Sequence, residues 1–311
     1  MKKYLPYIAI VTAMLIWSVS GIAIKVALTV FPPLTMIVIR FSIAVVLMVT
    51  IGLSVRLVSD NNEQKKERML VLQKVEKGDL PLFMLGGFFV PFLYYLLETV
   101  TFDSLSSPTI AEALLSMDPV FAPVFGVLLL REKVTRYNLY GIALSTVGML
   151  MLLLMGADSF ALGNAWGLLT AFFAVCAAVL YSVILRRIPT RYSALTVVCY
   201  MQGFALLLFI AIWLFTDKTV ENVSLSGVLS VLYLAVFSSV TAFILFCYTV
   251  RQIGVTRANV FNNIRPAFTA LAMFFLFDEH LPWGKLVGIV LIIFGLFICQ
   301  HSTAAHSPKR E

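Results

Sequence analysis

The feature that most constrains this chain is a series of apolar stretches, each about 20 residues long, that recurs along its whole length. A helix of about 20 apolar residues crosses a hydrocarbon layer of roughly 30 Å. The mean hydropathy is +0.96 and only 13% of the residues are charged, too few to cover the core of a soluble domain with polar surface. The sequence therefore predicts an all-α membrane protein.

Charged residues and turn residues divide the chain into ten expected membrane-spanning helices. These are Leu5–Leu28, Leu34–Leu57, Leu80–Thr101, Pro108–Leu130, Tyr137–Met155, Gly163–Leu185, Ser193–Phe215, Ser226–Val250, Val255–Phe277 and Gly284–Gln300. With the N-terminus inside, only Lys218 and Lys285 of the 23 Lys and Arg residues lie in loops on the outer side. The positive-inside rule then predicts an inner-membrane protein with both termini cytoplasmic. The net charge of +7 is a topology signal, and no nucleic-acid partner is expected.

One long polar segment, 59–79, lies between the second and third expected helices. Leu70, Leu72 and Val75 suit one face of a short helix at the membrane interface, together with Met69. The mixed charge of the segment favours the alternative, a solvated cytoplasmic loop.

An internal repeat relates the two halves of the chain. Residues 107–154 align with residues 254–301 at a constant shift of 147 residues. The matched pairs are Ala111 and Ala258, Pro119 and Pro266, Glu132 and Glu279, Gly141 and Gly288, and Gly148 and Gly295. Because five helices separate the copies, the second copy enters the membrane from the opposite side. We predict two inverted five-helix repeats, 1–156 and 157–303, followed by a cytoplasmic tail, 304–311.

Short motifs accompany this repeat. They are Trp17-Ser, Pro32-Pro33-Leu34, Arg40-Phe41, Pro119-Val-Phe, Leu-Leu-Leu-Arg131-Glu132 and Gly141…Gly148 in the first half, and Asn259-Val-Phe-Asn262, Pro266-Ala-Phe-Thr-Ala, Glu279 and Gly288…Gly295 in the second. With these motifs the chain resembles the EamA family of the drug/metabolite transporter superfamily over nearly its full length. The resemblance implies ten helices, a central cavity between two repeats, and export or exchange of metabolites such as amino acids. Asp118 and Arg265 replace the small or apolar residue usual before the repeated proline, so a relative's substrate does not transfer.

Six ionisable residues lie within the expected helices: Lys25, Arg40, Glu98, Glu112, Asp118 and Arg265. A charge at the bilayer centre costs about 2.5–3.5 kcal/mol and so usually faces a cavity or a partner. Four of the six lie toward the outer face, where we predict coupling or gating roles for Glu98, Glu112, Lys25 and Arg40. For Lys25 and Arg40, snorkelling to the interface is an equal alternative.

Asp118 and Arg265 are the two charges nearest the membrane midplane, and the shift of 147 residues relates them. Each precedes a proline, which frees a backbone carbonyl. We predict that the two side chains face one another or a shared substrate in a central cavity, where they suit the amine and carboxylate of a zwitterion. A structural ion pair between them is the alternative.

Polar and aromatic residues supply further candidates for this cavity. Asn262 and Asn263 form a polar stripe with Asn259, for substrate contact or for hydrogen bonds between helices. Trp17 and Tyr94 are candidates for its wall, although aromatic residues in membrane helices also serve packing.

These patterns predict a secondary transporter of a small-molecule substrate in a lipid bilayer, working by alternating access. The sequence has no nucleotide-binding loop, catalytic motif or clustered metal-ligand spacing. We therefore expect no cofactor, no metal and no enzyme activity. A membrane channel and a membrane-embedded enzyme are the alternatives, and the oligomeric state stays open.

Overall fold

A computed structural model describes residues 4–59, 70–105, 108–131, 134–155, 165–216, 220, 223–277 and 283–301. The described residues form helices and contain no β-strand. Seven helical segments among them are long and apolar enough to cross a membrane: Leu5–Leu28, Pro33–Val55, Leu80–Ser104, Ile110–Leu130, Ala165–Arg187, Ala194–Trp213 and Leu225–Ile253. The prediction of an all-α membrane protein is confirmed.

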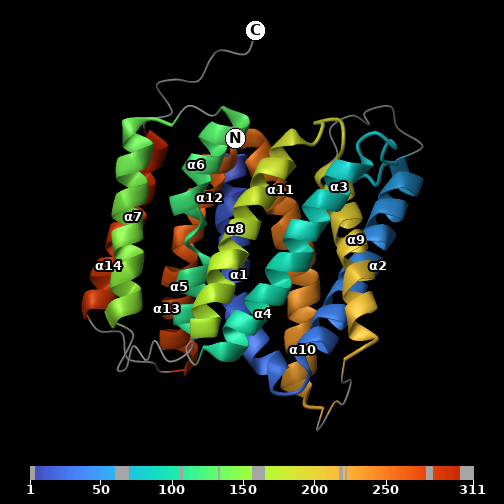
Figure 1. Cartoon of the computed structure of the whole chain (residues 1–311), viewed down its shortest axis with the longest axis horizontal. Helices are drawn as coiled ribbons and strands as arrows, with labels where there is room; N and C mark the ends of the chain where they lie inside the picture. The colour runs from blue at the N-terminus through green and yellow to red at the C-terminus, as the bar shows by residue number, and fades with distance from the viewer. Residues whose placement is uncertain are drawn as a thin grey trace.

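Each half of the chain contributes a similar series of helices (Figure 1). The first half holds α1 (Leu5–Leu28), α2 (Pro33–Ser59), α3 (Leu80–Gly87), the π-helical segment η2 (Phe88–Leu93), α4 (Tyr94–Ser104), α5 (Pro108–Leu115), α6 (Asp118–Leu130) and α7 (Arg136–Met155). The second half holds α8 (Ala165–Arg187), α9 (Ala194–Trp213), α10 (Leu225–Tyr233), the π-helical segment η3 (Leu234–Ala242), α11 (Phe243–Ile253), α12 (Val255–Val260), the short 3-10 segment η4 (Phe261–Asn263), α13 (Ile264–Phe277) and α14 (Trp283–His301).

The sequence accounts for several of these helix ends. Pro119 stands in the first turn of α6, where the backbone donor that proline lacks has no helical partner. Ser193 caps α9 by accepting a hydrogen bond from the Thr196 backbone N–H at 3.0 Å. Between α11 and α12, Gly254 has φ 91°, a conformation that glycine adopts without strain. The chain can therefore turn there without a long loop.

Four of the expected spans are interrupted near their middle, at corresponding places in the two halves. The π-helical segment 88–93 corresponds under the shift of 147 to 235–240, which lies within η3. The non-helical pair 116–117 between α5 and α6 corresponds to 263–264, where η4 gives way to α13. The starts of α5 and α7, at 108 and 136, likewise recur at 255 and 283 for α12 and α14, and the start of α6 at 118 recurs within one residue at 264 for α13.

The helices α7 and α14 pack side by side along one edge of the bundle, at the left of Figure 1. A Cβ atom on Gly148 would lie 2.5 Å from the backbone oxygen of Gly288, and one on Gly295 would lie 2.6 Å from that of Gly141. The four glycines of the sequence repeat therefore form one interface, in which each copy packs its backbone against the other.

The first helix runs through the middle of the bundle, against α10, α11 and α13. It begins at the same end of the bundle at which α14 finishes, at the top of Figure 1. An even number of crossings is consistent with this placement.

Residues 70–79 are not helical, so the interfacial helix is wrong for this part of segment 59–79, where a loop is the favoured interpretation. The Glu76 backbone N–H donates to the Tyr192 hydroxyl at 3.1 Å, and the Thr196 hydroxyl donates to the Val71 backbone oxygen at 3.0 Å. These bonds, made with the first turn of α9 and the turn before it, replace bonds that a helix would make. Met69, Glu132, Glu279 and the tail 304–311 lie outside the described residues.

Candidate functional site

A cavity lies in the middle of the bundle, where the interrupted spans meet α1 and α8. It contains about 530 Å³ of space outside the atoms, part of it continuous with open solvent. It is lined by Trp17, Ser20, Val90, Tyr94, Tyr95, Glu98, Leu115, Asp118, Ala178, Tyr181, Ser182, Ser238, Phe243, Phe246, Asn259, Asn262 and Arg265. All four interrupted spans therefore contribute to one site.

Asp118 is buried in the cavity wall at the first position of α6. The amide nitrogen of Asn262 donates a hydrogen bond to its Oδ2, while its Oδ1 has no hydrogen-bond partner among the described residues. A helix N-terminus carries a partial positive charge, which favours an ionised carboxylate there. Asp118 is thus held by an amide and a helix end, and no described Lys or Arg forms an ion pair with it.

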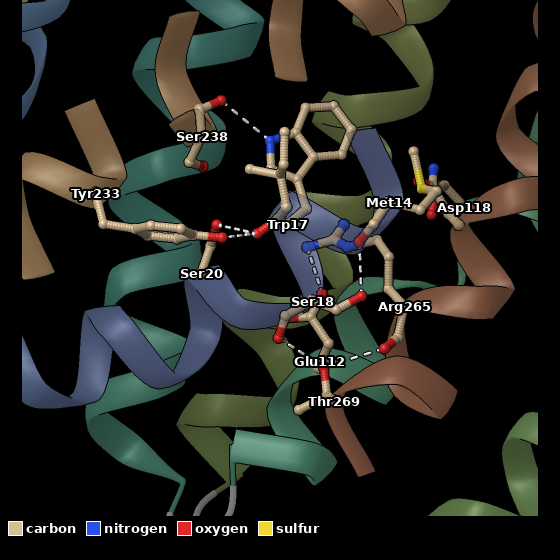
Figure 2. A network of polar contacts seen from close by, with 12 residues as sticks. Met14, Trp17, Ser18, Ser20, Glu112, Asp118, Tyr233, Ser238, Arg265 and Thr269 are labelled. Carbon is tan, nitrogen blue, oxygen red and sulfur yellow. Dashed lines mark hydrogen bonds and ion pairs between the residues drawn. The ribbon is translucent and has the colours of Figure 1, made fainter. Parts of the chain in front are cut away.

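Arg265 lies on the same cavity but is paired with Glu112. Its Nη2 is 2.5 Å from Glu112 Oε1, and the Glu112 side chain is completely buried. The guanidinium carbon also lies 5.6 Å from the centre of the Trp17 ring. Figure 2 shows Arg265 directed toward Glu112, with Asp118 outside the dashed network. The alternative of a structural ion pair between Asp118 and Arg265 is wrong, because the Arg265 guanidinium pairs with Glu112 on α5. Both residues line one cavity, and a shared substrate stays a prediction.

A chain of polar contacts ties α1 to the walls of this cavity (Figure 2). Trp17 Nε1 donates to the Ser238 backbone oxygen at 3.2 Å, and the Thr269 hydroxyl donates to the Ser18 backbone oxygen at 2.8 Å. The Tyr233 hydroxyl donates to the Ile16 backbone oxygen at 2.7 Å. The α1 backbone is therefore fixed to η3, α13 and α10 at the level of the site.

Arg40 lies behind the cavity wall, fully buried. Its Nε and Nη2 donate to the hydroxyls of Ser239 and Ser238 at 2.7 and 2.8 Å, and its guanidinium lies 4.3 Å from the centre of the Tyr95 ring. Because its exposed fraction is 1%, the prediction that it snorkels to the interface is wrong. Gln202, which donates to the Ser239 backbone oxygen at 2.5 Å, supports the same π-helical segment from α9.

Glu98 and Lys25 occupy different surroundings from one another. Glu98 lines the cavity together with Asp118, deeper than its expected place near the outer face. The helix that carries Glu98 continues to Ser104, past the expected end at Thr101, which accounts for this depth. Lys25 is only partly buried and donates to the Leu105 backbone oxygen outside the cavity lining.

The expected asparagine stripe is divided between two environments. Asn259 and Asn262 line the cavity, whereas Asn263 donates to the Ser145 hydroxyl on α7 at 2.6 Å. The 3-10 turn at 261–263 rotates neighbouring side chains away from the helical spacing. Asn263 therefore joins two helices at a place outside the cavity wall.

Sequence reasoning missed several lining residues, chiefly Tyr181, Ser182, Ser238, Phe243 and Phe246. Phe243 packs edge-on to Trp17, with ring centres 5.3 Å apart, and Phe246 tilts against the same ring at the same distance. The one sequence signal available was the pair Ser238 and Ser239 within an otherwise apolar span. For an aromatic residue in an apolar helix, the sequence does not indicate whether the side chain faces a cavity, another helix or lipid.

The family model of EamA-like transporters matches residues 5–154 and again residues 165–299. The chain belongs to the EamA-like transporter family. The resemblance predicted from its motifs is confirmed.

Individual relatives of this EamA-like protein agree with that assignment. It is 22% identical over 300 residues to an uncharacterized transporter of Archaeoglobus fulgidus, covering 96% of this chain and 98% of the relative. It is 24% identical over 306 residues to the uncharacterized transporter YcxC of Bacillus subtilis, covering 93% and 91%. A 26% match to the uncharacterized inner membrane transporter YedA of Escherichia coli covers 57% and 56%.

A solved crystal structure shares the fold, with a TM-score of 0.76 and 19% identity over 94% of this chain and 97% of that chain. Family and fold together identify a multi-pass membrane protein with a transporter role.

Proposed function

We propose that this EamA-like protein is a secondary transporter that moves small polar metabolites, amino acids among them, by alternating access through the central cavity. Asp118, Arg265, Asn262, Trp17 and Tyr94 are the proposed substrate-site residues. The observation that carries this proposal is a central cavity bounded by four interrupted spans, with opposite charges at equivalent positions. Interrupted helices with half-helix ends at a midplane site are typical of such carriers.

The proposed architecture is ten transmembrane helices in two inverted five-helix repeats. The recurrence of helix starts and interruptions at a shift of 147 residues supports it. The interface of α7 with α14 supports it as well, because equivalent glycines meet there. In this arrangement α7, α12 with α13, and α14 supply the three spans beyond the seven apolar segments.

We further propose that the protein lies in the inner membrane with both termini cytoplasmic, as the distribution of Lys and Arg favours. A cysteine at position 66 should react with a membrane-impermeant maleimide only after the cells are opened, and one at position 217 should react in intact cells. Labelling of position 66 in intact cells would contradict this orientation.

Counterflow from proteoliposomes tests the transport mechanism. Vesicles are preloaded with unlabelled amino acids, amines, nucleosides or sugar phosphates, and uptake of the labelled compound is followed. A carrier accumulates label transiently and saturates with substrate concentration. Flux that never saturates and shows no counterflow would indicate a channel and contradict the proposal.

The gating proposal concerns Glu98, Glu112, Lys25 and Arg40. If Glu98 carries a coupling proton, Glu98→Gln abolishes pH-driven uptake and leaves exchange intact. The exposed Asp103, also on α4, gives a matched control in Asp103→Asn. Equal loss of uptake and exchange in Glu98→Gln would rule out a role confined to coupling.

A further inference from the structure

Five buried ionisable side chains surround the centre of the described structure, and their charges do not balance. Two are cations, Arg40 and Arg265, and three are carboxylates, Glu98, Glu112 and Asp118. Isolated charges in a medium of low polarity are costly, so an excess carboxylate is either matched by a further cation or neutralised by a proton. With three carboxyl groups and two guanidinium groups, this set has room for one more cation.

Both buried arginines are already engaged. Arg265 pairs with Glu112 at 2.5 Å, and its Nε is buried without a hydrogen-bond partner in the described structure. Arg40 lies outside the cavity lining, and its Nε and Nη2 donate to the hydroxyls of Ser239 and Ser238. A substrate carboxylate prefers two parallel donors from one guanidinium, and the guanidinium that lines the cavity already holds Glu112.

Asp118 lines the cavity and forms no ion pair with any described residue. Asn262 donates to one of its oxygens, and the other is buried, lines the cavity and has no partner in the described structure. The carbonyl oxygen of Asn262 is likewise buried without a partner. Two acceptors therefore stand together on one wall, which is the pattern that a donor with several N–H groups would satisfy.

The wall beyond Asp118 is aromatic. Tyr181, Phe243 and Phe246 line the cavity, and the Tyr181 and Phe243 rings lie edge to face with centres 6.3 Å apart. Aromatic rings bury apolar area and attract cations through their negative faces. Such a wall suits a substrate with an apolar body and a cationic end.

We propose that Asp118 binds the ammonium group of an organic monocation whose apolar body packs against Phe243, Phe246 and Tyr181, and that the substrate needs no carboxylate. This inference rests on the proposed transport function and narrows its substrates from amino acids to primary amines. The ammonium group supplies the charge that the buried set lacks and donors for both orphaned acceptors.

Three probes of one shape test this inference: tyramine, tyrosine and tyrosol, which carry an ammonium group, an ammonium group with a carboxylate, and a neutral hydroxyl. Ligand binding raises the midpoint of thermal unfolding of the purified full-length protein by mass action, so titration gives the affinity. Tyramine should bind at least about tenfold more tightly than either other probe, as expected for a charge-assisted hydrogen bond. Equal affinity for tyramine and tyrosol, or tighter binding of tyrosine, overturns the inference.

Asp118→Asn should abolish the difference between tyramine and tyrosol. The control Asp103→Asn, an exposed carboxylate on α4, should preserve the difference. Retention of the tyramine preference in Asp118→Asn contradicts the assignment to Asp118. If Asp118→Asn does not fold, the ranking of the three probes on the unaltered protein still decides the question.

Counterflow separates this inference from the proposed function. Saturable exchange of tyrosine with no effect of tyramine supports transport and overturns the amine site. Stabilisation by tyramine that depends on Asp118, without counterflow of any probe, supports the amine site and contradicts transport.

Discussion

Arg265 and Asp118 occupy equivalent positions in the two halves of the chain, yet their side chains have different kinds of partner. Arg265 meets a carboxylate from the other half, Glu112, in a fully buried ion pair. Asp118 meets only an amide from the other half, that of Asn262. Under the shift of 147 residues the counterpart of Glu112 is Asn259, a neutral residue. The comparison teaches that a repeated scaffold can place different partners around charged residues at equivalent positions.

The largest expected effect is a difference in the free energy of unfolding between a variant that neutralises Arg265 and one that neutralises Asp118. Arg265→Gln should lower the free energy of unfolding by about 3–5 kcal/mol, because it leaves Glu112 buried and unpaired. Asp118→Asn should change it by less than about 1 kcal/mol, since it removes a lone buried charge and keeps a hydrogen-bonding side chain. Unfolding of each variant in mixed detergent micelles measures the difference.

The double variant Arg265→Gln/Glu112→Gln serves as the control for this contrast. It should recover much of the lost stability, because no unpaired charge remains. Equal destabilisation by Arg265→Gln and Asp118→Asn would contradict the inference that Arg265 is held in an ion pair and Asp118 is not.

A second prediction replaces Asn262, the hydrogen-bond donor to Asp118, with the residue found at the equivalent position of the first half. Leu115 is the counterpart of Asn262, so Asn262→Leu removes the amide donor from Asp118. The loss should be about 1–3 kcal/mol, the cost of leaving a buried acceptor unsatisfied. In the Asp118→Asn background the same change should cost less, and a double-mutant cycle measures the coupling. A coupling energy of zero would mean that the two side chains do not interact.

A third prediction concerns the interface of α7 with α14, where equivalent glycines of the two halves make similar contacts. Gly148→Ala and Gly295→Ala should each destabilise the protein by about 1–3 kcal/mol, because the added methyl group meets the backbone of the facing helix. Gly203→Ala on α9, where nothing lies within 4 Å, should stabilise it by about 0.5–1 kcal/mol. A large difference between the first two variants would break the similarity of the halves at this interface.

The smallest expected effect lies at the end of the bundle, where charges are exposed. The Tyr192 hydroxyl donates to Asp79 at 2.7 Å, and with Arg191 it holds the pKa of Asp79 below its ordinary value. A carboxyl with a lowered pKa in the folded protein contributes stability at neutral pH and loses it as the pH falls through that lowered pKa. The protection of the Glu76 amide, measured against its intrinsic exchange rate at each pH, should therefore fall in acid. Tyr192→Phe should lower this protection already at pH 7, and Asp79→Asn should remove the acid dependence specific to this site.

Much of the fold was predictable from the sequence because hydrophobic length and helix punctuation are local properties. The expected span Val255–Phe277 begins with α12 and ends with α13. The expected span Pro108–Leu130 begins with α5 and ends with α6. The interruptions within these spans were not predicted in form, although the prolines at 119 and 266 mark two of them. The wide turns of η2 and η3 depend on packing between helices, which no local pattern specifies.

The sequence by itself determined the class of the protein, its family and the identity of its intramembrane charges. A lipid environment requires long apolar helices, and because charges within such helices are costly and rare, each one stands out in the sequence. Only the tertiary structure decided which charges meet. The shift of 147 residues names Asp118 and Arg265 as equivalents, but equivalent residues need not be neighbours. Arg265 reaches Glu112, six residues before its own counterpart, because α13 packs against α5. The packing of the helices sets the distances between side chains on different helices, and those distances determine which charged residues form an ion pair.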